Sequence, residues 1–220
     1  MFKNSGRGIE EKRNYWNKRY SAEGEIWGRL PSETCVVAAE AFKQMGVNTL
    51  MVPGCGYGRH SNYLSSIGFN VLGFDVSDIA ISLAKEKKGP NVKYMNLDVL
   101  ELSSLSERFD AIYSFNLIHL FKEEERQYIL ESFRQHLKGP SILAFTTFST
   151  RDIDFGKGTK IEYNIFETKP GRPVHFYNES ELRAVLRDWE IIELIHHSEC
   201  EDHGNYPHTH SLWYCLCKVM

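Results

Sequence analysis

Short apolar segments alternate along the chain with stretches in which apolar residues recur every three or four positions. Each short segment has the length of a β-strand, and a polar or helix-patterned stretch separates it from the next. The short segments cover residues 49–53, 70–75, 92–96, 109–115 and 141–148. Strands and helices that alternate in this way are typical of a parallel sheet covered by helices. The pattern therefore predicts an α/β fold.

Several of the predicted helices have recognisable ends. Ser77 is a good N-cap for a helix that stops at the Gly-Pro pair at 89–90. A second helix is expected over residues 122–137, because three glutamates fill its first turn, where the helix dipole favours negative charge. The Gly-Pro pair at 139–140 is expected to end it. A further helix is predicted over residues 178–186.

The pattern changes in the last third of the chain. Residues 149–177 include a stretch rich in Gly, Lys and Thr that predicts a long loop, inserted as a flap over the substrate site. Two apolar segments, 189–196 and 212–219, are joined by a polar loop over 198–210 and predict a final hairpin on the sheet. We expect one domain for the whole chain, with residues 1–45 as an N-terminal helical cap.

Composition and charge narrow the range of partners. The chain has 26 Lys and Arg against 29 Asp and Glu, a formal net charge of -3, so it has no broad basic surface for nucleic acid. Its longest apolar stretch is too short to span a membrane. Its five cysteines form no dense disulfide framework and predict reduced thiols. These features predict a cytoplasmic protein that acts on a small molecule.

A glycine-rich loop follows the first predicted strand. Gly54, Gly56 and Gly58 alternate there, which allows a sharp turn and lets the backbone lie against a ligand. A dinucleotide fingerprint would need glycine at the position of Arg59, and a P-loop would need Lys-Ser or Lys-Thr after the last glycine. Both phosphate-binding interpretations are therefore disfavoured.

Acidic residues end the next two predicted strands. Asp75 lies 21 positions after Gly54, at the carboxyl end of the second strand, where its carboxylate can accept two hydrogen bonds from a ribose diol. Asp98 follows the third strand and lies within reach of an adenine amino group. Together with the glycines they indicate a nucleoside site. The alternative is that the glycines form turns and the acids cap helices.

These motifs resemble those of a known family. The segments 52–58, 73–77, 96–99 and 109–112 are similar to the successive motifs of class I S-adenosylmethionine (SAM)-dependent methyltransferases. The resemblance covers residues 16–143. The aromatic lead-in over residues 15–32 is similar to the small-molecule branch that includes tellurite-resistance and thiol methyltransferases.

The resemblance implies a Rossmann-like three-layer sandwich with a mixed seven-stranded sheet whose last strand is antiparallel. It implies SAM as the methyl donor and assigns a set of residues to it. In that set the glycine loop passes beneath the donor, the acids and the residues after them hold ribose and adenine, and N-terminal aromatic residues form a lid over the sulfonium. The set is Trp16, Tyr20, Trp27, Gly54, Cys55, Gly56, Gly58, Asp75, Val76, Asp98, Val99 and Phe115. For the three lid residues, the alternative role is to anchor the first helix on the core.

Two departures from common motifs bear on the acceptor. Pro53 stands where many members have an acid, as it does in thiol methyltransferase-like sequences. Residues 114–117 lack the Asn/Asp-Pro-Pro-aromatic motif of enzymes that methylate amino groups of DNA bases or glutamine. Those acceptors are therefore disfavoured.

Histidines are the candidate catalytic residues. His119 follows the fourth strand and can transfer a proton near neutral pH, or it can simply lie beside the adenosine. An antiparallel last strand brings its start to the cofactor edge, so His208 and His210 are expected over the substrate pocket, both pointing to one face. They are expected to contact substrate. Metal binding with His203, or with Cys200 or Glu201, and a solvated polar loop are the alternatives.

We therefore predict a SAM-dependent methyltransferase with a small-molecule acceptor that offers an O, S, N or metalloid nucleophile, and with no bound metal. Methylation of protein or tRNA is the alternative within the same class. A nicotinamide-dependent oxidoreductase and a non-catalytic SAM-binding or metal-sensing protein are the alternatives outside it.

Overall fold

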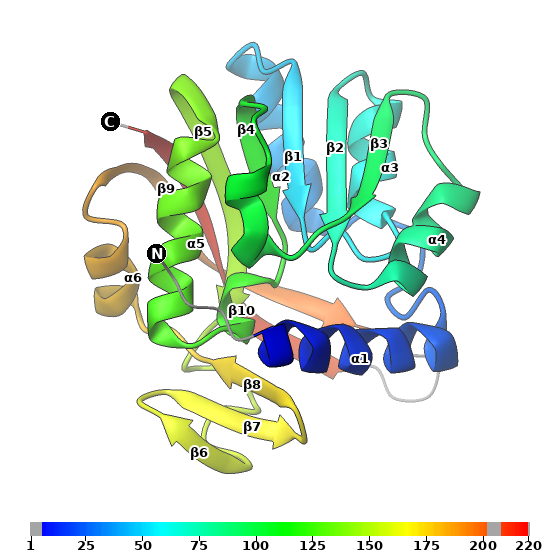
Figure 1. Ribbon diagram of the computed structural model, residues 1–220. Coiled ribbons are helices and arrows are strands. Elements are labelled where there is room, and N and C mark those ends of the chain that lie inside the picture. Colours follow the sequence, from blue (N-terminus) through cyan, green and yellow to red (C-terminus); the bar gives the residue numbers. More distant parts are fainter. Residues whose placement is uncertain (1–5, 202–207, 220) are drawn as a thin grey trace.

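A seven-stranded mixed sheet forms the centre of the computed structural model, which describes residues 6–201 and 208–219 (Figure 1). The strand order is β3-β2-β1-β4-β5-β10-β9. The strands are β1 (Thr49–Pro53), β2 (Asn70–Asp75), β3 (Val92–Asn96), β4 (Phe109–Ser114), β5 (Leu137–Phe148), β9 (Trp189–Glu201) and β10 (His208–Val219). β1 to β5 pair in parallel, and β10 is antiparallel to both of its neighbours. The predicted seven-stranded sheet with an antiparallel last strand is confirmed.

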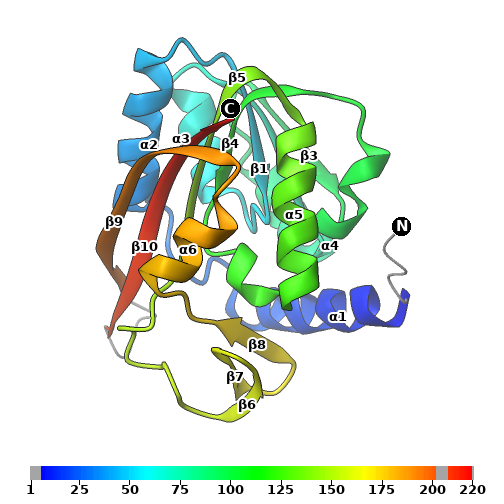
Figure 2. The same ribbon diagram turned by 90° about the vertical axis from the view of Figure 1, so that its left-hand side faces the viewer.

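Helices cover both faces of this sheet (Figure 2). They are α1 (Gly6–Glu23), α2 (Glu33–Gln44), α3 (Arg59–Ser66), α4 (Asp78–Glu86), α5 (Glu123–Gln135) and α6 (Glu179–Val185), with short 3-10 turns η1 (Val99–Ser104) and η2 (Ile118–Leu120). One hydrophobic cluster joins the sheet to α2, α3 and α4, and another joins it to α5 and α6. This arrangement confirms the three-layer α/β sandwich. Among the helices described, none is both long and apolar enough to cross a membrane.

The predicted helix starts hold, and one predicted stop is wrong. Ser77 caps α4 by accepting a hydrogen bond from the amide of Ala80, and Asn178 caps α6 in the same way through Glu181. The second Gly-Pro pair does not act as a stop, because α5 has already ended at Gln135. Residues 139 and 140 lie instead in the exposed first part of β5, which begins at Leu137 beside Phe109 of β4.

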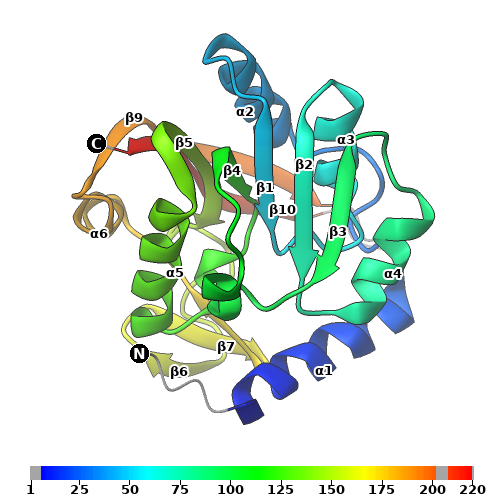
Figure 3. The same cartoon turned by 45° about the horizontal axis from the view of Figure 1, so that its top comes forward.

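Helix α1 lies across the carboxyl ends of the parallel strands, toward which the arrowheads of β1, β2 and β3 point (Figures 1 and 3). Asn17 ties it to the start of α4 through two hydrogen bonds of 2.6 Å, one with Asp78 and one with Ser77. Lys12 forms an ion pair of 2.9 Å with Glu125 of α5. The N-terminal helix is thus held over the sheet edge from both sides.

The predicted flap is more ordered than the sequence suggests. It contains an antiparallel sheet of β6 (Thr159–Glu162), β7 (Ile165–Lys169) and β8 (Arg172–His175). Val174 and Phe176 pack with Phe148 and Leu212 in a hydrophobic cluster that attaches this small sheet to the ends of β5 and β10. The sequence pattern, which predicted a long loop inserted as a flap, did not predict these strands, because their apolar positions are too few and too irregular.

The final hairpin is longer than predicted. β9 extends to Glu201, and β10 begins at His208, which pairs with Glu201. His208 and His210 therefore lie on a strand rather than in the polar loop where the sequence placed them. His203 lies outside the described residues.

Candidate active site

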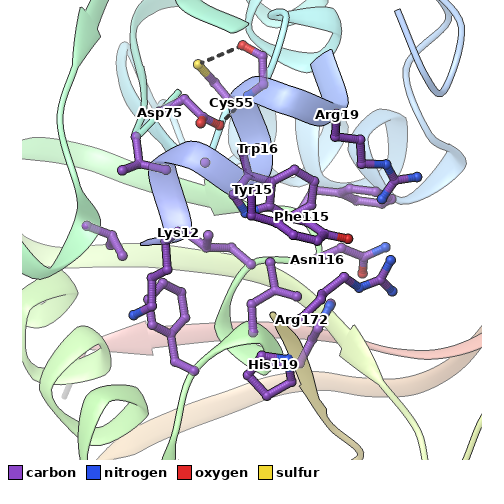
Figure 4. Close-up of a pocket in the computed structure, with 18 of the residues that line it drawn as sticks. Lys12, Tyr15, Trp16, Arg19, Cys55, Asp75, Phe115, Asn116, His119 and Arg172 are labelled. Atoms are coloured by element: carbon purple, nitrogen blue, oxygen red, sulfur yellow. Dashed lines mark hydrogen bonds between the residues drawn. The ribbon is translucent and has the colours of Figure 1, made fainter. Parts of the chain in front are cut away.

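A cavity of about 750 Å³ opens at the carboxyl ends of the parallel strands, between the glycine loop, α1 and the flap sheet. Fourteen of the fifteen residues assigned from the sequence to the donor or to catalysis line it: Trp16, Tyr20, Trp27, Gly54, Cys55, Gly56, Asp75, Val76, Asp98, Val99, Phe115, His119, His208 and His210. The fold thus brings together residues from both ends of the chain. Figure 4 shows side chains of α1, such as Trp16, in the same pocket as Asp75 and His119.

The glycine loop adopts a backbone that only glycine takes easily. Gly54 and Gly56 have φ values of +63° and +54°, in the left-handed region. A Cβ at Gly56 would lie 2.6 Å from the hydroxyl of Tyr20, and one at Gly54 would lie 2.8 Å from a methyl group of Leu117. The sequence assigned Gly58 to the donor site as well, but Gly58 is not among the residues that line the cavity. It is the N-cap residue of α3 and lies against Tyr94.

Asp75 lies at the centre of the wall formed by β1 and β2. Its Oδ2 accepts a hydrogen bond of 2.9 Å from the amide of Gly56, and its Oδ1 accepts one of 2.9 Å from the amide of Ser77. Burial raises the pKa of Asp75 to about 6, although these amide hydrogen bonds oppose the shift. A carboxylate has about four lone-pair sites, so each oxygen can still accept a hydrogen bond from a ligand.

Asp98 also combines two roles. It caps η1 through a hydrogen bond of 2.8 Å from the amide of Leu100, as the capping alternative proposed, and it lines the cavity as well. Burial raises the pKa of this carboxyl. Capping therefore fixes the position of Asp98 without excluding ligand binding, since the carboxylate has lone pairs to spare.

The three predicted lid residues form one aromatic cluster with Tyr57. The ring of Trp16 lies 5.9 Å from that of Tyr20 and 6.4 Å from that of Trp27, and Trp27 stacks on Tyr57 at 6.3 Å. The guanidinium of Arg19 lies 5.2 Å from the ring centre of Trp27. The cluster packs α1 against the glycine loop, as the anchoring alternative proposed, and it also lines the cavity. The role as a lid over a sulfonium stays a prediction.

His119 faces the opposite end of the cavity in a dry environment. Its side chain is only 2% exposed, and its ring lies 4.5 Å from that of Phe148. Its Nδ1 has no hydrogen-bond partner in the part of the chain that the structure describes. Burial lowers the pKa of His119 well below its ordinary value, and the charges of Arg172 and His210 act in the same direction. His119 is therefore a neutral imidazole at physiological pH.

A second histidine group lies beside it. His210 Nδ1 is 2.9 Å from Oδ2 of Asp152, and His210 Nε2 is 3.1 Å from Nε2 of His208. The ring of His210 also contacts Phe148, at 4.7 Å between the ring centres. Both histidines of the last strand line the cavity, and their predicted contact with substrate stays a prediction.

Sequence analysis missed Asp152 and a set of basic residues. Arg19 from α1 and Lys169 and Arg172 from the flap line the cavity. Burial lowers the pKa of Lys169, and the positive charges of Arg172 and Arg19 lower it further. No local signal marks these residues, because their common surface exists only once the flap sheet lies beside α1.

One group of side chains has the composition of a metal site. The nitrogen and oxygen atoms of Asp152, Asp154 and His210 all lie within 4.8 Å of one another. Asp152 Oδ1 already accepts a hydrogen bond from the amide of Asp154, and Oδ2 accepts one from the amide of Ser211 in addition to its contact with His210. This hydrogen bonding favours a carboxylate that orients His210 over one that binds a cation.

Comparisons with known proteins match this chain to methyltransferases. The family described as a methyltransferase domain matches residues 52–139. A probable SAM-dependent methyltransferase, TehB of Haemophilus influenzae, is 26% identical over 190 residues, which cover 83% of this chain and 57% of that protein. Thiocyanate methyltransferase 1 of Arabidopsis thaliana is 25% identical, with 69% of each chain covered. The chain thus spans just over half the length of TehB.

Solved structures share the fold. A SAM-dependent methyltransferase from Anabaena variabilis superposes with a TM-score of 0.75 at 21% identity, over 96% of this chain and 95% of that one. A 1,6-didemethyltoxoflavin-N1-methyltransferase from Burkholderia thailandensis gives a TM-score of 0.72 at 17% identity, over 100% of this chain and 92% of that one.

Proposed function

We propose, on the premise that this chain carries a class I SAM-dependent methyltransferase domain, that it transfers a methyl group from SAM to a small-molecule acceptor. One observation carries the proposal: a single cavity joins the glycine loop and the two strand-end acids at one end to a group of histidines at the other. The first end suits a nucleoside, and the second suits a nucleophile that must be positioned and deprotonated.

The residues of the first end fit SAM. Asp75 would hold the ribose diol through the lone pairs left free by Gly56 and Ser77, and Asp98 with Val99 would hold the adenine. A side chain at Gly54 or Gly56 would collide with neighbouring residues. The loop therefore exposes only backbone, which lets a ligand lie close against it. When bound, SAM supplies an electrophilic methyl group on a positively charged sulfur.

The aromatic cluster would receive that charge. Rings of Trp16, Tyr20 and Trp27 line the cavity above the glycine loop, and aromatic faces attract cations. They also exclude water from the place where donor and acceptor meet. An enzyme can accelerate an in-line methyl transfer largely by holding the two reacting atoms in line, which is the role we assign to these walls.

The size of the cavity supports a small acceptor. Its volume of about 750 Å³ lies within the ~300–1,000 Å³ of pockets that hold drug-sized ligands, which suits small molecules. Residues of helix α1 and of the flap sheet line the cavity, and walls on these sides disfavour a protein or tRNA acceptor. The names of the relatives that act on thiocyanate and 1,6-didemethyltoxoflavin support this choice. We keep a cytoplasmic location and the absence of a bound metal as predictions.

The direct test is calorimetric titration of the protein with SAM, S-adenosylhomocysteine and NAD. Micromolar binding of the two sulfur compounds and none of NAD is expected, and Asp75→Ala should weaken binding at least tenfold because the ribose contact is lost. Asp188→Ala is the matched control, since that acid is exposed and far from the cavity.

The other outcomes select the alternatives. Binding of NAD in place of SAM would indicate the oxidoreductase and overturn the proposal. Binding of SAM without methylation of any compound in a broad acceptor panel would favour the non-catalytic sensor.

A further inference from the structure

We propose that His210, oriented by Asp152, is the general base of the proposed methyl transfer, and that the acceptor therefore carries a proton on its nucleophile, as an alcohol, a phenol or an ammonium group does. This inference rests on the proposed function. It selects within the acceptor class, because a thiolate or a halide ion needs no base.

Asp152 is built to hold a histidine ring. It lies in the turn after β5, only 5% exposed, and its two oxygens accept hydrogen bonds of 2.9 Å from the amide of Asp154 and 2.8 Å from the amide of Ser211. Burial raises the pKa of Asp152, but these amides and His210 outweigh burial and lower it overall. The side chain is thus a fixed carboxylate in direct contact with His210 Nδ1.

This contact decides which nitrogen of His210 carries the proton. A carboxylate can only accept, so Nδ1 of the neutral ring must donate to Asp152, and Nε2 is left with a lone pair. His208 Nε2 lies 3.1 Å from that lone pair and is the donor to it in the protein without substrate. An acceptor hydroxyl or ammonium that enters the cavity replaces His208 as the donor.

The surroundings favour a proton on His210 during the reaction. Within the described part of the chain, the titratable groups around His210 come from three elements: Asp152 and Asp154 from the turn after β5, His208 from its own strand, and His119 from η2. His119 stays neutral because of burial, so it adds no positive charge, and Arg172 acts on His119 from the flap. The carboxylate of Asp152 therefore stabilises the imidazolium that forms.

The step balances as follows. The acceptor atom forms a bond to the methyl carbon while the carbon–sulfur bond of the methyl sulfonium donor breaks, and that electron pair stays on the sulfur as a neutral thioether. His210 Nε2 takes the proton that the acceptor atom loses. After the methyl transfer, His210 gives this proton to water and returns to the neutral ring that is protonated at Nδ1.

Nuclear magnetic resonance tests the geometry without any acceptor. With ¹⁵N-labelled histidine at a pH where the ring is neutral, His210 should be protonated at Nδ1 in the wild type. Asp152→Ala should shift His210 toward the Nε2-protonated form. Protonation at Nε2 in the wild type, or a form unchanged by Asp152→Ala, would overturn the proposal.

Kinetics with matched acceptors tests the chemistry. S-Adenosylhomocysteine formation is followed with substituted phenols and with the thiophenols of the same skeleton. His210→Gln should lower kcat/KM for the phenols by about 10²- to 10⁴-fold, the usual contribution of a general base, and should leave the thiophenols within a few-fold. His197→Gln is the matched control, because His197 also contacts a carboxylate, Glu199 at 3.0 Å, but does not line the cavity.

The outcomes separate the two proposals. Equal loss for phenols and thiophenols in His210→Gln, with SAM binding intact, would overturn the general base and leave methyl transfer standing. If the wild-type protein does not bind SAM, the proposed function itself is overturned. If neither acceptor set is methylated, the protonation state of His210 still decides whether Asp152 orients the base.

Discussion

Oδ2 of Asp75 accepts a hydrogen bond of 2.9 Å from the amide of Gly56, so the acid that ends β2 is tied to the loop that follows β1. The bond holds the glycine backbone and the carboxylate in one orientation before any ligand arrives. It also means that the charge of Asp75 and the shape of the loop depend on each other, which makes the donor end of the cavity sensitive to pH.

The affinity for SAM should fall as the pH drops below about 6. Burial raises the pKa of Asp75 to about 6, so the folded protein takes up a proton there, and the neutral acid loses a lone pair that a ribose hydroxyl needs. Each further pH unit should weaken binding about tenfold. Calorimetric titration at several pH values between 5 and 7 measures this dependence.

Asp75→Asn is the control for that effect. It should bind SAM weakly at every pH in this range, since asparagine does not titrate. A slope in the variant as steep as that of the wild type would show that another group is responsible.

Substitution of Gly56 should be far more costly than substitution of Gly46. Both glycines have positive φ, at +54° and +71°, but a Cβ at Gly46 meets nothing within 4 Å, whereas one at Gly56 meets the hydroxyl of Tyr20. Gly46→Ala should cost about 1 kcal/mol from backbone strain alone. Gly56→Ala should cost about 1–3 kcal/mol more, as overpacking usually does, and should abolish SAM binding.

Urea denaturation of the two glycine variants gives this difference. Equal free energies of unfolding would mean that Tyr20 moves aside without cost, and α1 would then be less firmly seated on the loop than its contacts suggest.

Binding of SAM should change the tryptophan fluorescence of the protein. Trp16 and Trp27 line the cavity, whereas Trp189 and Trp213 lie in the hydrophobic core away from it. Most of the change should disappear in the double variant Trp16→Phe/Trp27→Phe and persist in Trp189→Phe. A change that survives undiminished in the double variant would argue against a lid over the donor.

One thiol should react quickly with an aromatic disulfide reagent in the native protein. Cys200 is exposed, while the other four cysteines are buried, and burial raises the pKa values of their thiols. All five should react after unfolding, because none is in a disulfide. Slow reaction of every thiol in the folded state would place Cys200 in a covered position.

The strands and helix starts could be predicted because their signals are local. The apolar runs predicted the bounds of β1 to β4 to within one residue. Ser77 and Asn178 cap helices through their own side chains. The start of β5 could not be predicted. Leu137 joins this strand because it pairs with Phe109, and pairing with a distant strand outweighs the local effect of a Gly-Pro pair.

The convergence of the glycine loop with Asp75 and Asp98 on one cavity was also predictable. In a parallel sheet the carboxyl ends of neighbouring strands meet at one edge, so the order of glycines and acids along the chain already implies that they converge. The sequence did not show that Gly58 faces Tyr94 instead of the cavity, since that depends on how α3 packs against β3.

The sequence by itself determined the α/β class, the parallel strands and the convergence of the glycine loop with Asp75 and Asp98, because these follow from periodicity and from the geometry that any parallel sheet imposes. Only the tertiary structure brought Asp152 to the histidines at the other end of the cavity. Asp152 and His210 are 58 positions apart, and they meet because β10 runs antiparallel beside β5 and brings its start to the turn where β5 ends. No local pattern encodes such a contact, since it arises from the packing of distant segments.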